Sequence, residues 1–151
     1  MPFKKLHSGI QEKLESLNIH TPTEFQSSSI PIIKSGANVY CMAPKESGKT
    51  STLVWTTLQK LKCEADGNAP RAVVLVENKE RAMELYDTFL AYTKYNSLRV
   101  YVGHEQLHID VQKSEIFMGV DILISTPKTM NKLFLLNGVS TAQLKIISID
   151  D

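Results

Sequence analysis

Residues 39–55 read VYCMAPKESGKTSTLVW and combine three local patterns in succession. A run of mostly β-forming residues over 39–42 comes first, a proline and a glycine then mark 43–48 as a turn, and helix-compatible residues follow from Lys49. The pattern predicts a strand, a turn and a helix in that order. This is the first half of a unit in which a helix carries the chain from one parallel strand to the next.

The rest of the chain repeats this alternation between short apolar runs and longer amphipathic stretches. The apolar runs lack clean alternation, which is typical of buried parallel strands. We therefore expect an α/β fold with a mainly parallel five-stranded sheet flanked by helices on both faces, and a ligand beyond the carboxyl ends of the strands. The expected strands are 39–42, 72–76, 98–102, 121–124 and 145–149, and the expected helices between them are 49–62, 79–94, 107–117 and 128–136.

Two further helices are expected before the first strand. Ile10, Leu14 and Leu17 share one helical face, and a second helix is expected from Thr23, as its N-cap, to about Lys34. The linker-like cluster at 65–70 is interpreted as a loop within one domain that spans residues 1–151.

Composition narrows the class of protein. The 151 residues are 42% hydrophobic and 22% charged with a net charge of +1, so overall charge neither indicates nor excludes a nucleic-acid partner. No signal-peptide core and no apolar run of membrane-spanning length is present, which favours a cytoplasmic protein with no membrane partner. Cys41 and Cys63 lack metal-ligand spacing and are expected to be free thiols.

The turn at 43–48 has the chemistry of a phosphate-binding loop. It matches GxxxxGK[ST] except at the first position, where Ala43 stands. The amides that begin the helix can receive an anion, Lys49 can reach the β and γ phosphates, and the hydroxyl of Thr50 can ligate Mg²⁺. The alternative is a surface turn followed by an ordinary lysine.

With its surroundings, this loop resembles the N-terminal RecA-like domain of the DEAD-box RNA helicases, whose phosphate loop reads AxTGSGKT. Thr21 to Gln26 (TPTEFQ), followed by Ile30-Pro31, resembles the family's Q motif, and Gln26 lies 23 residues before Lys49. The resemblance implies that Gln26 reads adenine through its amide and that an upstream aromatic, here Phe3, stacks on the base. The implied ligands are ATP and Mg²⁺, and the implied nucleotide-binding residues are Phe3, Gln26, Ala43, Lys45, Glu46, Ser47, Gly48, Lys49 and Thr50.

Three later segments resemble the family's RNA-binding motifs. They are ENKERA at 77–82 in the place of motif Ia (PTRELA), VGH at 102–104 in the place of VGG, and STPKT at 125–129 in the place of motif Ib (TPGR). In relatives these loops hold the backbone of single-stranded RNA without reading its sequence. The implied RNA-binding residues are Lys79, Gly103, Thr126, Pro127 and Lys128, and the alternative is that they are ordinary loop residues.

His104, His108 and Asp110 are candidate ligands for a metal site. The two histidines stand four residues apart, as on one helix face, but the segment lacks a defined further ligand, so we expect no metal there.

The last five residues, ISIDD, resemble the strand that leads into motif II. Asp150 corresponds to the first Asp of DEAD, which engages Mg²⁺ through water, and Asp151 stands in the position of the Glu that orients the attacking water. The resemblance implies Lys49, Asp150 and Asp151 as catalytic residues, with Thr50 and Asp150 at the metal. The alternative is a solvated acidic pair.

Two departures from the family pattern predict a weaker enzyme. Glu46 replaces a glycine that lets the backbone approach the phosphates, and its like charge should cost ~1–3 kcal/mol of ATP binding unless the side chain reaches solvent. Asp151 is one methylene shorter than Glu, about 1.5 Å less reach, which predicts slow or absent hydrolysis.

The resemblance implies an ATP-dependent RNA helicase in which this chain is the N-terminal half. The family completes its ATP site with a second RecA-like domain, so we expect that domain as a partner and no duplex unwinding by this chain alone. One alternative is a noncatalytic RNA- or protein-binding module with a degenerate nucleotide site. A different P-loop ATPase or kinase would leave Gln26 and the Thr126-Pro127 pair unexplained.

Overall fold

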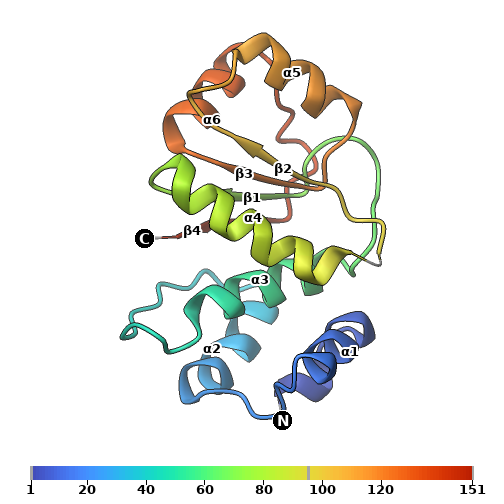
Figure 1. Cartoon of the computed structure of the whole chain (residues 1–151), viewed down its shortest axis with the longest axis vertical. Helices are drawn as coiled ribbons and strands as arrows, with labels where there is room; N and C mark the ends of the chain where they lie inside the picture. Colours follow the sequence, from blue (N-terminus) through green and yellow to red (C-terminus); the bar gives the residue numbers. More distant parts are fainter. Residues whose placement is uncertain (1, 95, 151) are drawn as a thin grey trace. The chain divides into compact units, whose positions relative to one another are not determined.

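The structure is a computed structural model and describes residues 2–94 and 96–150. The chain forms two compact units, Met1–Cys63 and Glu64–Asp151, which differ in architecture (Figure 1). The first unit is helical, and the second contains a parallel sheet between helices.

In the first unit, a short 3₁₀-helix η1 (Pro2–Lys5) is followed by α1 (Ser8–Ser16), α2 (Glu24–Lys34) and α3 (Lys49–Lys60). Both α1 and α2 contact α3. Thr23 is the N-cap of α2, as predicted, and forms a capping box with the third helical residue. The apolar side chains buried in this unit include Phe3, Leu6, Ile10, Leu14, Ile30, Val54, Trp55 and Leu58.

The strand predicted over 39–42 is wrong, because this segment has no regular structure between α2 and α3. Tyr40 and Met42 are 86% and 80% exposed. A β-forming run becomes a strand only where it lies on a neighbouring strand and buries one face, and this run does neither. The residues that the structure describes therefore contain four strands.

The four strands of the second unit form one parallel sheet. They are β1 (Ala72–Leu75), β2 (Val100–Gly103), β3 (Ile122–Ser125) and β4 (Ile146–Ile149), in the order β2-β3-β1-β4. The register pairs Val73 with Leu123 and with Ile147. The helices α4 (Lys79–Thr93), α5 (Ile109–Met118) and α6 (Pro127–Leu135) connect successive strands.

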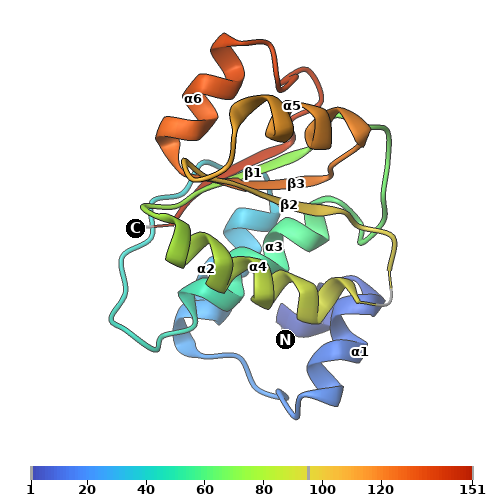
Figure 2. The same cartoon turned by 45° about the horizontal axis from the view of Figure 1, so that its top comes forward.

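Helices cover both faces of this sheet. Helix α4 lies on one face, and α5 and α6 lie on the other (Figure 2). On the α5–α6 side, Val73 and Leu123 pack in a cluster with Ile116, Val120 and Leu133. Neighbouring strand residues point to opposite faces. The predicted fold class, an α/β fold with a parallel sheet between helices, is confirmed.

Strand β4 lies at one edge of the sheet, next to β1. Its Ile147 and Ile149 share one face of the pleat, and 59% and 74% of their surfaces are exposed. Among the described residues this strand is thus the least covered part of the sheet.

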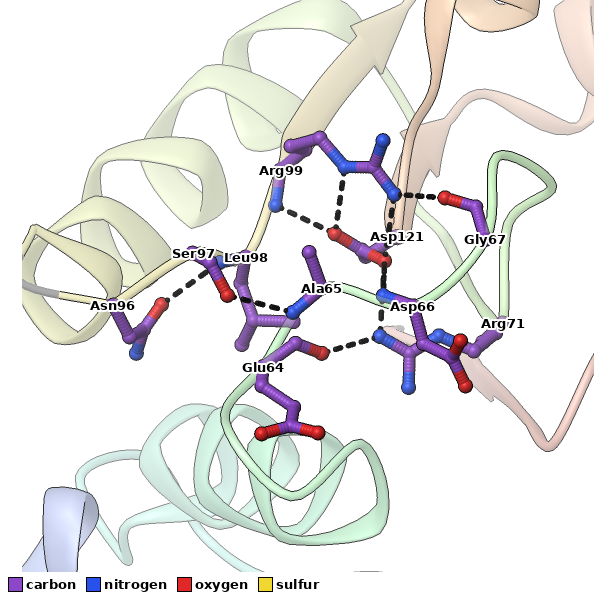
Figure 3. Close-up of polar contacts among 10 residues, drawn as sticks. All are labelled: Glu64, Ala65, Asp66, Gly67, Arg71, Asn96, Ser97, Leu98, Arg99 and Asp121. Atoms are coloured by element: carbon purple, nitrogen blue, oxygen red, sulfur yellow. Dashed lines mark hydrogen bonds and ion pairs between the residues drawn. The ribbon is translucent and has the colours of Figure 1, made fainter.

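A fully buried carboxylate, that of Asp121, holds together the segments at the amino ends of the strands (Figure 3). Asp121 directly precedes β3, and its Oδ1 accepts hydrogen bonds from the Asp66 amide (3.2 Å), Arg71 Nη2 (2.9 Å) and Arg99 Nη2 (3.1 Å). Its Oδ2 accepts from the Arg99 amide (2.9 Å) and Arg99 Nε (3.0 Å). The loop 64–71, the residues before β2 and the start of β3 are held together through this one side chain.

The pKa of Asp121 reflects this environment. Burial by itself would raise the pKa, but the hydrogen bonds from Arg99 and Arg71 and from the two amides outweigh it and leave the pKa below its ordinary value of 3.8. The carboxylate is therefore ionised and paired in the folded protein.

Candidate functional site

The turn that precedes α3 is built around two residues with positive φ. Gly48 has φ +91° and Glu46 has φ +63°. Only glycine adopts this left-handed conformation without a steric penalty, so Glu46 holds a backbone shape suited to glycine at a cost of about 1–2 kcal/mol. Its side chain is exposed, which places the carboxylate where water and salt screen it.

Helix α3 begins at this turn without a side-chain cap. Gly48 is its N-cap and forms no side-chain capping bond, so the N-cap residue leaves the first amides of the helix unbonded at the positive end of the dipole. The buried Oγ of Ser47 has no hydrogen-bond partner in the described structure. Lys49 is exposed and Thr50 is partly exposed in the first turn. Hydroxyl, ammonium and amide donors at one helix start fit a polyphosphate.

The predicted adenine reader, Gln26, contacts the same loop. Its side chain is 4% exposed; Oε1 accepts from the Thr23 amide (2.9 Å), and Nε2 lies 3.5 Å from the Gly48 carbonyl oxygen. Thr23 Oγ1 also donates to the Ser47 carbonyl oxygen (2.7 Å). The start of α2 is thus bonded to the phosphate loop at two points.

This contact gives Gly48 a second role. A Cβ at position 48 would collide with the side-chain amide of Gln26. The link from Thr23 to Ser47 was not predicted from the sequence, because Thr23 was interpreted only as a helix cap and the two residues are 24 positions apart.

The other predicted nucleotide residues lie in different surroundings. Phe3 is 8% exposed and packs edge-on against Trp55, with ring centroids 5.2 Å apart. Ala43 is half-buried before the turn, and the side chain of Lys45 within it is exposed. Stacking of Phe3 on a base stays a prediction.

The predicted RNA-binding residues lie in the second unit, at the end of the sheet where the strands have their carboxyl ends. Lys79 begins α4 after β1, Gly103 ends β2, and Thr126 caps α6 after β3. The carboxyl ends of parallel strands meet at one edge, which brings the three loops together. Pro127 and Lys128 form the first turn of α6 at the same place.

Two residues that the sequence did not single out bridge these loops. Gln106 Oε1 accepts from Lys79 Nζ (2.8 Å), and Glu105 Oε1 accepts from Thr126 Oγ1 (2.8 Å). Both lie in the loop that follows β2. Their only sequence signal is that position, because polar residues after a strand are common in loops.

The two candidate metal-ligating histidines, His104 and His108, have structural hydrogen bonds. His104 is buried, and its Nδ1 accepts from the Gln106 amide (3.2 Å); desolvation and then the charge of Lys79 lower its pKa. His108 caps α5 by accepting from the Asp110 amide. Across residues 2–94 and 96–150, no three His, Cys, Asp or Glu side chains gather as a metal site would require.

Asp150, at the carboxyl end of β4, is bound by an arginine. Arg81 Nε lies 2.6 Å from Asp150 Oδ2 and Arg81 Nη2 lies 3.1 Å from Oδ1, a two-pronged pair. Hydrogen bonding to Asp150 is the main reason that the pKa of Arg81 is raised, so the guanidinium is charged. Asp151 lies outside the described residues.

Mg²⁺ is implied by the phosphate loop, and the donors suit it in kind. Mg²⁺ is usually held by one or two carboxylates together with substrate phosphates and water. Asp150 supplies a carboxylate of that type, and each of its oxygens retains a further lone pair beside the bond to Arg81. Thr50 supplies a hydroxyl in the first unit.

A family model described as DEAD/DEAH box helicase matches residues 23–151. The chain belongs to this family. It is 28% identical over 137 residues to "Probable ATP-dependent RNA helicase ddx42" of Dictyostelium discoideum, covering 89% of this chain and 14% of that protein. It is 26% identical to "ATP-dependent RNA helicase RhlB" of Pectobacterium carotovorum, covering 97% of this chain and 35% of that protein. It is 33% identical to "ATP-dependent RNA helicase DBP10" of Meyerozyma guilliermondii, covering 70% of this chain and 12% of that protein.

This DEAD/DEAH box helicase chain therefore spans between about an eighth and a third of the length of these relatives. None of its described helices has both the length and the apolar character needed to cross a membrane.

Proposed function

We propose that this chain is the ATP-binding domain of an ATP-dependent RNA helicase that couples ATP binding and hydrolysis to RNA binding or unwinding. The observation that carries the proposal is the bonding of α2 to the phosphate loop, through Thr23 to Ser47 and Gln26 to Gly48. A base-reading side chain fixed against the loop that receives the phosphates is the arrangement an adenine nucleotide site needs.

Each nucleotide-side residue has a distinct role in this proposal. The amides of the first turn of α3 and the Ser47 hydroxyl receive the phosphates, and the Lys49 ammonium offsets the charge on the β and γ phosphates. The amide of Gln26 matches the N6 donor and N7 acceptor of adenine. Phe3 would have to leave its contact with Trp55 to stack on the base.

By the family pattern, each unit offers one proposed ligand for Mg²⁺: Thr50 in the first unit and Asp150 in the second. The ion would supply positive charge to the β and γ phosphates. Asp150 offers carboxylate oxygen and Thr50 a hydroxyl, and the proposed task of Asp151 is to orient the attacking water. Asp151 has shorter reach than Glu, so the expected hydrolysis is slow.

The loops at the carboxyl ends of the strands in the second unit form the proposed RNA surface. Lys79 and Lys128 contribute positive charge, and Gly103, Thr126 and Pro127 contribute backbone and hydroxyl contacts to single-stranded RNA. A second RecA-like domain of the same protein is the proposed partner that completes the ATP site. The free thiols Cys41 and Cys63 suit a reducing compartment such as the cytoplasm.

The test is a nucleotide-dependent thermal shift on wild type, Lys49→Ala and Lys60→Ala. Lys60 is an exposed lysine at the other end of α3 and serves as the matched control. ATP at 100 times its dissociation constant should stabilise wild type and Lys60→Ala by about 2.7 kcal/mol and Lys49→Ala by much less. A wild type that does not respond to ATP would favour a noncatalytic module.

A second measurement addresses the base. Gln26→Ala should lose preference for ATP over GTP, because the base contact is removed, and binding of inorganic triphosphate measured alongside reports the separate effect of losing the contact to Gly48. Equal preference for the two nucleotides in wild type and variant would remove Gln26 from its proposed role.

A further inference from the structure

The loop between β2 and α5 is held by a buried amide side chain. Gln112, in α5, is 1% exposed, and its Oε1 accepts a hydrogen bond from the His104 amide (3.2 Å). Its Nε2 donates to the carbonyl oxygens of His104 (2.9 Å) and Leu107 (3.0 Å). The His104 ring also accepts from the Gln106 amide. The backbone on both sides of Glu105 is therefore fixed, which defines where its side chain leaves the loop.

The hydroxyl of Thr126 has both of its hydrogen-bonding roles filled. Its Oγ1 donates to Glu105 Oε1 (2.8 Å) and, as the N-cap of α6, accepts from the Thr129 amide (3.3 Å). The residue is 2% exposed, and a hydroxyl has a single hydrogen to donate. An RNA phosphate oxygen, which accepts hydrogen bonds, can therefore take this hydrogen only when the Glu105 carboxylate gives it up.

Lys79 differs from Thr126 in what its bonded partner leaves for a phosphate. Its Nζ donates to Gln106 Oε1 (2.8 Å), but an ammonium group has three hydrogens and the partner is neutral. Glu105, by contrast, is an exposed carboxylate bonded at the start of α6, where the positive end of the helix dipole favours an anion. Of the two residues that bridge these loops, Glu105 is the one whose charge opposes a phosphate.

We propose that Glu105 limits the affinity of this chain for single-stranded RNA, because its carboxylate takes the hydrogen that a phosphate would accept from Thr126. RNA must break this hydrogen bond and approach a like charge before it reaches the Thr126 hydroxyl. This inference rests on the proposed function, because it takes the loops at the carboxyl ends of the strands as the RNA surface. All the residues involved belong to the second unit. Glu105 thus has an effect opposite in sign to that of Lys79 and Lys128.

The test measures binding of the full chain to a fluorescein-labelled, single-stranded oligouridine by fluorescence anisotropy, at low and at high salt. Glu105→Gln removes the charge but keeps an acceptor for Thr126, and it should raise the affinity about threefold at low salt. Glu105→Ala also releases the hydroxyl, and it should raise the affinity about tenfold at low salt. High salt should reduce the gain in both variants, because it screens the charge that they remove.

Two controls address the kind of charge and its location. Glu115→Gln makes the same change at an exposed position of α5, beside the loop 68–70 that precedes β1 at the other end of the strands, and should leave RNA affinity unchanged. Lys79→Ala removes a proposed phosphate contact and should lower both the affinity and its salt dependence. Thermal unfolding of each variant identifies loss of structure.

A double-mutant cycle isolates the hydrogen bond between Glu105 and Thr126. Thr126→Val removes the hydroxyl, and it should cost less RNA affinity in wild type, where Glu105 holds the hydrogen, than in the Glu105→Ala background. Equal losses in the two backgrounds would overturn the inference, because Glu105 would then not restrict the hydroxyl.

The outcomes separate this inference from the proposed function. If RNA binds and Lys79→Ala weakens binding, but both Glu105 variants leave the affinity unchanged or lower it, the inference is overturned and the proposed RNA surface stands. If the oligouridine binds neither wild type nor any variant, or if Lys79→Ala leaves its affinity unchanged, the proposed RNA surface fails, and this inference fails with it.

Discussion

The buried carboxylate at the amino end of the sheet and the phosphate loop in the helical unit are both polar, but they differ in how fully their groups are bonded. Both oxygens of Asp121 accept hydrogen bonds, and none of its surface is exposed. At the phosphate loop, the buried Ser47 Oγ has no partner in the described structure, and α3 starts without a side-chain cap.

The difference separates structural polar groups from those that can bind a ligand. A buried polar group costs free energy unless it is bonded, so a saturated cluster stabilises the fold and has little left to offer another molecule. A cluster with unused donors is less stable by itself, but an anion that binds to those donors stabilises the folded state. Four changes test this contrast.

Asp121→Asn should have the largest effect. It leaves the buried guanidinium of Arg71 and the partly buried one of Arg99 without their carboxylate, which should lower the free energy of unfolding by about 3 kcal/mol. Urea unfolding followed by circular dichroism measures the change. Asp87→Asn, at an exposed position on α4, should stay within about 0.5 kcal/mol of wild type. Equal effects in the two variants would contradict the structural role of Asp121.

The dependence of stability on acid pH should test the contribution of the same carboxylate, Asp121. Because the pKa of Asp121 is lower in the folded protein than its ordinary 3.8, its contribution is complete above pH 3.8 and is lost as the pH falls through the lowered value. The urea midpoint of wild type should therefore decline more steeply than that of Asp121→Asn below this pH. Parallel curves for the two proteins would show that Asp121 is not the responsible group.

Gly48→Ala should have the next largest effect, through both backbone strain and a collision with Gln26. Gly36 is the matched control, because it has the same φ of +91° but nothing within 4 Å of an added Cβ. Alanine at position 36 should cost about 1 kcal/mol, and alanine at position 48 about 2 kcal/mol together with a loss of nucleotide affinity. Fluorescence of the single, buried Trp55 reports unfolding. Identical losses at both positions would mean that Gln26 yields without cost.

Glu46→Gly should have the smallest effect on stability and the opposite sign. Relief of the left-handed strain should gain roughly 0.5 kcal/mol after the entropy of glycine is subtracted. Affinity for ATP, measured by calorimetry, should rise about threefold to tenfold. Glu46→Gln removes the charge but keeps the strain. Comparing the two variants therefore shows whether the charge or the backbone strain limits ATP binding. An unchanged dissociation constant in both would exclude Glu46 as the cause of weak binding.

The sequence predicted the elements whose signals are local. The Thr23 cap, the helices around the sheet and the four strands of the second unit follow from periodicity and turn chemistry. The strand at 39–42 was wrong because a strand also needs a partner, which periodicity does not report.

The long-range polar pairs of the candidate site could not be predicted from the sequence, for a related reason. Arg81 and Asp150 are 69 positions apart, and Thr126 and Glu105 are 21 apart. Their pairing depends on which strands become neighbours in the sheet. The residues of the phosphate loop could be named because they are consecutive, whereas the arginine that pairs with Asp150 could be found only in the structure.

The edge position of β4 has a practical consequence for handling this chain in solution. An outer strand can extend its hydrogen-bond ladder to another molecule, and exposed Ile147 and Ile149 would favour that contact by leaving water together. Concentrated preparations are therefore expected to self-associate through this edge, and a charged side chain placed there would improve solubility without altering either polar cluster.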